Sequence, residues 1–228
     1  MIRCRTLVTF FLFGAFFSSP GTAQDLSKYR DFQFGTRLES VARQIHMDAS
    51  AAKTTHQRPA VIQTLQWAQL SYSDPAATDR SLRSIRFDFY NGELFKMVVA
   101  YDPVGTEGLT TEDMVEAISA IYGPATNPER TIAVSAFSAY QDNQKVLACW
   151  EDAQYSYNLF RAAYGNAFGL VAFSKKLDLV VSDSSREADR LDKLEAPARE
   201  LAQQVKQEED KRVAQEKARL ISKPKFRP

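Results

Sequence analysis

"RFDFYNGELFKMVVAYD", residues 86–102, has the pattern of two β-strands that meet at a turn. Asn-Gly between alternating apolar residues is the strongest short-range signal of a β-hairpin. The stretch is also rich in aromatic residues, which either line a site or form the inside of a sheet. The register of the hairpin decides between these two, because it decides which side chains share a face.

The turn can close in two ways that differ in register by one residue. In a two-residue loop, Tyr90 pairs with Glu93, and Lys96 lies among large apolar side chains. In a three-residue loop with a bulge at Gly92, Phe89 pairs with Glu93 and Lys96 leaves the apolar face. Burying an unpaired charge would cost roughly several kcal/mol, whereas the preference for one turn type over the other is worth only about a few tenths of a kcal/mol. We therefore predict the three-residue loop.

In this register one face of the hairpin is apolar and the other carries charge. The apolar face comprises Ile85, Phe87, Phe89, Phe95, Met97, Val99 and Tyr101, whereas Arg86, Asp88 and Lys96 share the other face. Tyr90, Leu94 and Val98 also fall on the charged face. We expect that face to be partly covered, either by the C-terminal helices or by a partner.

Two short helices are predicted outside the hairpin. Thr36 with Glu39, and Thr110 with Asp113, have the spacing of an N-terminal capping box. Apolar residues follow each box at helical spacing: Leu38, Val41, Ala42 and Ile45 in the first, and Met114, Val115, Ile118, Ile121 and Tyr122 in the second. Leu38, Val41, Ala42 and Ile45 match Met114, Ala117, Ile118 and Ile121 at a constant offset, which suggests a duplicated helix–strands unit.

The remaining segments of residues 24–181 are short and rich in β-branched and aromatic residues. We expect a strand at 61–70, loops at 48–60 and 71–80, and an antiparallel meander from 131 to 176, with turns at 141–143 and 164–166. This order of helices and strands predicts an α+β domain in which two short helices pack on a two-layer antiparallel sheet.

Residues 1–23 have the three parts of a secretory signal peptide. Arg3 and Arg5 form a basic region, an apolar run of about eleven residues follows, and small residues precede Gln24. A membrane-spanning helix would need about twenty apolar residues. We predict cleavage before Gln24, a periplasmic or secreted protein, and no integral membrane segment after cleavage.

Charge and cysteine content exclude some classes of protein. The net charge is +1 and becomes −1 when Arg3 and Arg5 are removed with the leader, so there is no basic excess for a nucleic-acid partner. The processed chain keeps Cys149 alone and therefore has no intramolecular disulfide. Cys149 lies in an apolar run, which favours a buried small side chain over a reactive thiol.

The composition changes at residue 182. Residues 183–228 contain twelve basic and ten acidic residues but one aromatic residue. A thin apolar stripe runs through Leu191, Leu194, Leu201, Val205 and Val213, too broken for a predicted coiled coil. We expect two charged helices separated at Pro197, the first partly packed on the domain, and a flexible tail at 223–228.

No catalytic, cofactor-binding or metal-binding motif is recognisable. The spacing of His46, Asp48 and His56 matches no known metal-binding motif. We interpret His46 as a residue at the end of a helix and His56 as a residue in a loop. Nucleophile, phosphate-loop and C-x-x-C patterns are missing from the sequence. We therefore expect no catalytic residue, no cofactor and no metal.

Carboxylate pairs offer one route to catalysis without other motifs. Glu107, Glu112 and Asp113 cluster at the start of the second helix, and Glu151 with Asp152 forms a turn. Helix-dipole and turn preferences account for both clusters. A small hydrolase or ligand-binding protein that uses such a pair remains the alternative hypothesis.

Tyr155 and Tyr157 alternate along one strand with Ser156, Asn158 and Phe160 on its other face. Such tyrosines either bury area beneath a helix, the reading we favour, or form a recognition surface. The residues considered for an interaction surface are Tyr90, Leu94, Val98, Tyr155 and Tyr157.

The segments "FGTRLESVARQI", "FDFYNGELFKMVVAYD", "GLTTEDMVEAISAIYG" and "CWEDAQYSYNLF", within residues 28–175, resemble uncharacterised exported bacterial proteins. They are also similar in style to small envelope proteins of the β-lactamase-inhibitor-like and BamE-type class. The resemblance implies an antiparallel sheet with helices on one face that binds protein. The chain departs from the BamE type in having no lipid-acceptor cysteine and in its long charged tail.

These observations lead to one preferred hypothesis. We expect a non-enzymatic, exported protein that binds another protein or itself, through its sheet and C-terminal helices.

Overall fold

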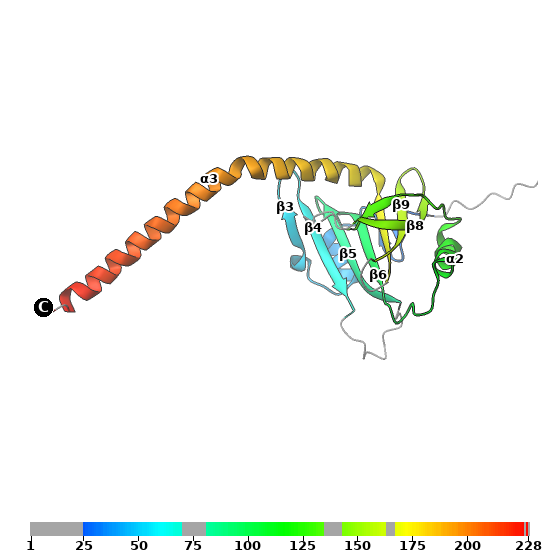
Figure 1. Cartoon of the computed structure of the whole chain (residues 1–228), viewed down its shortest axis with the longest axis horizontal. Helices are drawn as coiled ribbons and strands as arrows, with labels where there is room; N and C mark the ends of the chain where they lie inside the picture. The colour runs from blue at the N-terminus through cyan, green and yellow to red at the C-terminus, as the bar shows by residue number, and fades with distance from the viewer. Residues whose placement is uncertain (1–24, 70–80, 135–142, 163–166, 226, 228) are drawn as a thin grey trace, which may run out of the picture.

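The computed structural model describes residues 25–69, 81–134, 143–162, 167–225 and 227, and its centre is an eight-stranded antiparallel sheet (Figure 1). The order across the sheet is β3-β4-β5-β6-β10-β9-β8-β7. The bounds are β3 Lys53–His56, β4 Ile62–Ala68, β5 Leu82–Tyr90, β6 Glu93–Tyr101, β7 Thr131–Ala133, β8 Asn143–Glu151, β9 Tyr155–Arg161 and β10 Phe168–Ser174. With its helices, this sheet confirms the predicted α+β class.

The two halves of the sheet repeat one order of elements. Helix α1 (Leu38–Gln44) precedes the meander β3 to β6, and α2 (Thr111–Tyr122) precedes the meander β7 to β10. The last strands of the two halves pair at the centre, where Val98 lies opposite Val171. This arrangement is that of a duplicated helix–strands unit.

The central hairpin closes with the two-residue turn. Tyr90 pairs with Glu93, and the turn residues Asn91 and Gly92 have φ values of 50° and 80°. Positive φ at both positions is the type I′ geometry that Asn-Gly adopts most readily. The predicted three-residue loop, in which Phe89 pairs with Glu93, is therefore wrong.

A bulge in β6 preserves most of the predicted faces nevertheless. Phe89 pairs with Leu94 while Asp88 pairs with Lys96, so Phe95 has no partner opposite it. An extra residue in one strand reverses the alternation beyond it. Lys96 thus stays off the main apolar face although the turn keeps its preferred form.

The bulge exchanges two residues between the faces. Leu94 belongs to the main core, whereas Phe95 packs on the opposite face with Ile62 and Val181. The predicted places of Leu94 and Phe95 are wrong for this reason. The other predicted inward residues are in the main core: Ile85, Phe87, Phe89, Met97, Val99 and Tyr101. We call the face that bears this core the inner face.

The inner face is covered by α1, α2 and a hairpin of β1 (Lys28–Tyr29) and β2 (Phe32–Gln33). The predicted capping box of Thr110 and Asp113 is present in α2. The one predicted for α1 is not: its N-cap is Arg37, and the carbonyl of Thr36 accepts a hydrogen bond from the Leu94 amide instead. Of the predicted apolar residues in α2, Ile121 is exposed.

The outer face is crossed by α3 (Lys175–Ser222), which begins directly after β10 and ends in a short 3-10 turn, η2 (Lys223–Lys225). Pro197 lies inside this helix, so the predicted division into two helices is wrong. Figure 1 shows α3 lying along the sheet in its yellow part, bending in its orange part and then projecting away from the body. A proline ring removes one helical hydrogen bond and is the usual cause of such a bend.

The segment predicted as a loop at 48–60 contains a 3-10 turn, η1 (Ala49–Ala51), and the edge strand β3. The predicted leader, the loop at 71–80 and the turns at 141–143 and 164–166 fall wholly or partly outside the described residues.

Candidate functional site

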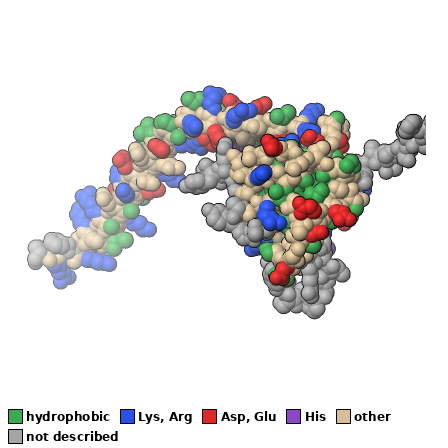
Figure 2. Space-filling model, turned by 45° about the vertical axis from the view of Figure 1, so that its right-hand side comes forward, with side chains coloured by type: hydrophobic (Ala, Val, Ile, Leu, Met, Phe, Trp, Pro, Cys, Tyr) green, Lys and Arg blue, Asp and Glu red, His purple; other side chains and the backbone are tan. Residues whose placement is uncertain are grey.

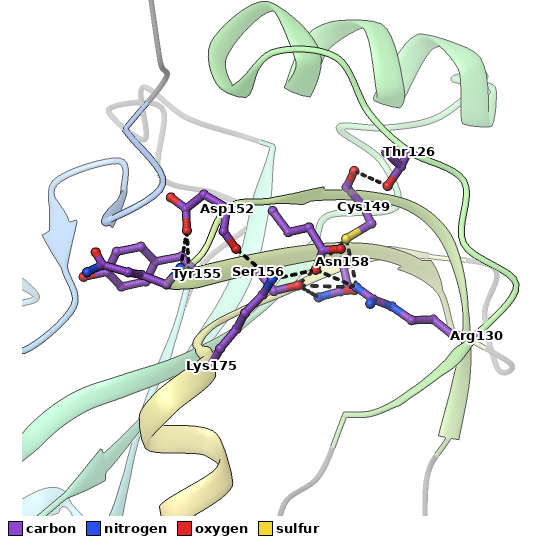
Figure 3. Close-up of polar contacts among 10 residues, drawn as sticks. Thr126, Arg130, Cys149, Asp152, Tyr155, Ser156, Asn158 and Lys175 are labelled. Atoms are coloured by element: carbon purple, nitrogen blue, oxygen red, sulfur yellow. Dashed lines mark hydrogen bonds and ion pairs between the residues drawn. The ribbon is translucent and has the colours of Figure 1, made fainter.

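A polar cluster lies on the outer face where β8 and β9 pair, and we call its members, Arg130, Cys149, Ser156 and Asn158, the Arg130 cluster (Figure 3). Arg130 comes from the segment between α2 and β7. Its guanidinium donates hydrogen bonds to Asn158 Oδ1 at 2.5 Å and to Cys149 Sγ at 2.8 Å. It also donates to Ser156 Oγ at 3.4 Å. The cluster therefore ties the segment after α2 to the sheet.

The chemistry of this cluster does not favour a nucleophile. The Cys149 thiol is buried, and burial raises its pKa above the ordinary value, although Ser156 and Arg130 oppose the shift. A reactive cysteine needs the opposite, a lowered pKa and some exposure. The predicted interpretation of Cys149 as a buried structural side chain agrees with this setting.

Next to the Arg130 cluster, one lysine fixes the start of α3. Lys175 Nζ lies 3.0 Å from Glu151 Oε2 and donates a hydrogen bond to the Asp152 carbonyl at 2.7 Å (Figure 3). The hydrogen bond from Lys175 is the main cause that lowers the pKa of Glu151. These contacts hold the first turn of α3 against the β8–β9 turn.

A second polar cluster lies under α3 on the other half of the outer face. Asp88 is fully buried, accepts a hydrogen bond from Thr64 Oγ1 at 2.9 Å and lies 3.2 Å from Arg86 Nε. Burial raises the pKa of Asp88, and the charge of Arg86 opposes this. Lys96 lies 3.8 Å from Asp178 of α3. Charged side chains thus join the sheet to the helix that covers it.

Apolar contacts complete the attachment of α3. Leu177 and Val181 pack on Phe95 and Ile62, and further along the helix Glu195 forms an ion pair with Arg58. The covering of this face by C-terminal residues is therefore as predicted. We call residues 175–196 the anchored part of α3.

The rest of α3 has different surroundings. Every residue from 197 to 225 is exposed, and we call residues 197–222 the free part. Five exposed apolar side chains follow one side of the helix from the end of the anchored part onward: Leu194, Leu201, Val205, Val213 and Leu220. We call them the distal row. Leu220 was not part of the predicted stripe, although it lies seven residues after Val213, the same spacing as from Leu194 to Leu201.

The five residues considered for an interaction surface do not share one. Tyr90 and Val98 lie on the outer face, in separate apolar clusters, and Leu94 is fully buried on the inner face. Tyr157 is fully buried, and Tyr155 stacks on Phe34 at a centroid distance of 5.1 Å. Both tyrosines pack on the inner face, which is the interpretation the sequence favoured.

Burial of the inner tyrosines keeps their hydroxyls neutral. The ring of Tyr122 from α2 lies 4.8 Å from that of Tyr157, and burial raises the pKa of Tyr122 to about 12. Burial raises the pKa of Tyr157 as well. Both shifts move the tyrosine pKa further from the neutral range that a general acid or base needs.

Three of the five carboxylates considered for catalysis, Asp113, Glu151 and Asp152, have partners in the local structure. Asp113 accepts hydrogen bonds from Thr110, which lower its pKa. Asp152 accepts from the Gln154 and Tyr155 amides at 2.6 and 2.7 Å. An open groove of about 380 Å³ between α2 and β8 has Glu112 and Glu116 on its wall. Successive turns of one helix place these two groups on the same side rather than opposite each other.

Among the described residues, no group of three or more histidine, cysteine or acidic side chains is placed to hold a metal ion. His46 follows α1 in a left-handed conformation, and His56 ends strand β3. Within the same part of the chain, none of the helices combines the length and the apolar character needed to span a membrane.

Comparison with known proteins adds no assignment: the chain matches no family model, no curated protein and no solved structure.

Proposed function

We propose that the protein is an exported, non-enzymatic module that binds protein through the free part of α3. The observation that carries this proposal is the distal row, in which each side chain is more than half exposed. A helix that packs on its own domain buries its apolar stripe, whereas α3 buries Val181 and leaves the distal row in solvent. An exposed apolar row on a helix is typically bound by an apolar groove of another protein or by another helix.

The alternative, a hydrolase with a carboxylate pair, has less support. Asp113, Glu151 and Asp152 already have partners within the fold, and Glu112 and Glu116 lie on one wall of an open groove. The protein-binding hypothesis gives the exposed part of α3 a role, whereas the hydrolase hypothesis gives it none.

Photo-cross-linking in cells that export the protein tests the proposal. A benzophenone amino acid replaces Leu201 in the distal row, and a matched variant carries it at Gln207, which lies on the opposite side of the same helix. We expect a discrete cross-linked product from position 201 and none from position 207. A protein that gives no cross-linked product from either position would contradict the proposal.

Export is tested separately by the N-terminus of the protein recovered outside the cytoplasm. We expect the first residue to be Gln24. Recovery of the full-length chain from the cytoplasm alone would contradict export and leave the proposal for α3 unaffected.

A further inference from the structure

The distal row follows one side of α3, from Leu194 near the end of the anchored part through the free part. At about 100° per residue, its five members fall within a sector of roughly 120°. Leu194 and Leu220 end the row, which spans about 39 Å along the helix at 1.5 Å per residue. The row is therefore a narrow seam, of the width used in the pairing of two helices.

The spacing of the row is nearly the same in both directions. Leu194 and Leu220 each lie thirteen residues from Gln207, and Leu201 and Val213 each lie six residues from it. When a second α3 runs in the opposite direction, Leu194 of each helix lies beside Leu220 of the other, and Leu201 of each lies beside Val213 of the other. Each of these two contacts therefore occurs twice in the helix pair.

Val205 is the one member of the distal row that has no apolar residue opposite it, and it lies near the centre of the seam. Val205 would face Glu209 of the other helix. The carboxylate of Glu209 lies 3.6 Å from the guanidinium of Arg212, one turn further along its own helix, and both side chains are largely exposed. Glu209 can therefore leave its stem on the seam and keep its charge in solvent.

The charge distribution favours opposite directions over equal ones. Residues 211–225 carry six basic side chains and one acidic, a net charge of +5, whereas residues 183–210 carry five basic and nine acidic, a net charge of −4. Figure 2 shows the basic side chains gathered over the free end of the helix. Parallel helices would set the basic ends beside each other. Antiparallel helices set each basic end beside the less basic stretch of its partner, which lowers the repulsion.

We infer that two copies of the chain pair through antiparallel α3 helices, with the distal row as the seam and its midpoint along the helix axis at the level of Gln207, whose side chain lies on the opposite side of the helix. This inference rests on the proposed function, because it names the partner of the same surface. It requires no residue of the sheet, whose outer face the anchored part already covers.

Cysteine cross-linking of the exported protein tests direction and register together. Leu194→Cys and Leu220→Cys variants carry tags of different size and react with a short bismaleimide; native Cys149 is buried and does not compete. We expect a covalent heterodimer when the two variants are mixed, and at least about tenfold less product from either alone. Equal products from each variant alone would show parallel helices and overturn the inference.

Sedimentation equilibrium supplies the affinity. We expect Leu201→Glu and Val213→Glu each to weaken dimerisation by at least about tenfold, because a charge enters the seam, while Gln207→Glu changes it by less than about twofold. Unchanged circular dichroism and melting temperature establish that the variants are folded. A wild-type chain that stays monomeric would overturn the inference.

The two proposals fail in different ways. A monomer whose position 201 still cross-links to another protein in cells overturns self-pairing and keeps the proposed function. A monomer with no cross-linked product overturns both.

Discussion

The anchored and free parts of α3 are built from the same kinds of residue but have opposite surroundings. Val181 is 3% exposed beneath the outer face, whereas Val213 is 56% exposed. In the anchored part, Asp178 and Glu195 pair with the domain, while in the free part Glu209 pairs with Arg212 of its own helix. The difference shows that an apolar stripe on a helix becomes core or interface according to what the rest of the fold places opposite it.

The largest expected effect is on the free energy of unfolding, when the same substitution is made at Val181 in the anchored part and at Val213 in the free part. Val181→Asp puts a charge into a buried apolar cluster, and we expect it to lower the free energy of unfolding by about 3 kcal/mol. Val213→Asp is the matched control and, at a protein concentration at which the chain is monomeric, should change it by less than about 0.5 kcal/mol. Denaturant unfolding measures both, and equal effects would contradict the distinction between the two parts.

A smaller effect is expected at the lysine that fixes the start of the helix. Lys175→Ala removes hydrogen bonds to Glu151 and the Asp152 carbonyl, and we expect a loss of about 1 kcal/mol because the side chain is partly exposed. Lys206→Ala in the free part is the control and should leave the free energy of unfolding unchanged. A loss at Lys206 as large as that at Lys175 would show that the free part is also attached to the domain.

The smallest expected effect concerns pH. The pKa of Glu151 is lowered in the folded protein from its ordinary value of 4.5, mainly by the hydrogen bond from Lys175. The unfolded chain therefore binds the proton more readily, so the contribution is complete above pH 4.5 and is lost as the pH falls through the lower folded value. We expect the difference in stability between wild type and Lys175→Ala to shrink from about pH 7 to about pH 3. A difference that grows on acidification would contradict the role of Glu151.

Much of the fold could be predicted from local patterns, and the exceptions have identifiable causes. The Thr110–Asp113 box was predictable because its two residues lie three apart in the sequence and bond each other. The Thr36 box was not, since the Thr36 carbonyl pairs with Leu94, which is distant in the sequence. A capping pattern cannot show which backbone groups the sheet will use.

The hairpin shows the same limit in another form. Turn chemistry and burial favoured different registers, and the bulge at Phe95 satisfies both. The bulge turns Phe95 to the outer face, where it packs with Val181 of α3, a residue distant in the sequence. The Arg130 cluster could not be predicted from local sequence patterns either, because two strands and a loop separate Arg130 from Asn158 along the chain.

Because α3 begins at the residue after β10, its direction is set by a strand paired on both sides within the sheet. The anchored part therefore keeps a fixed direction, and the free part acts as a lever whose pivot lies where the two parts meet, at Pro197. A tilt of about 10° at the pivot moves the far end of the free part, about 39 Å long, by roughly 7 Å. A small change in the bend at Pro197 therefore moves the far end of the distal row by several ångströms.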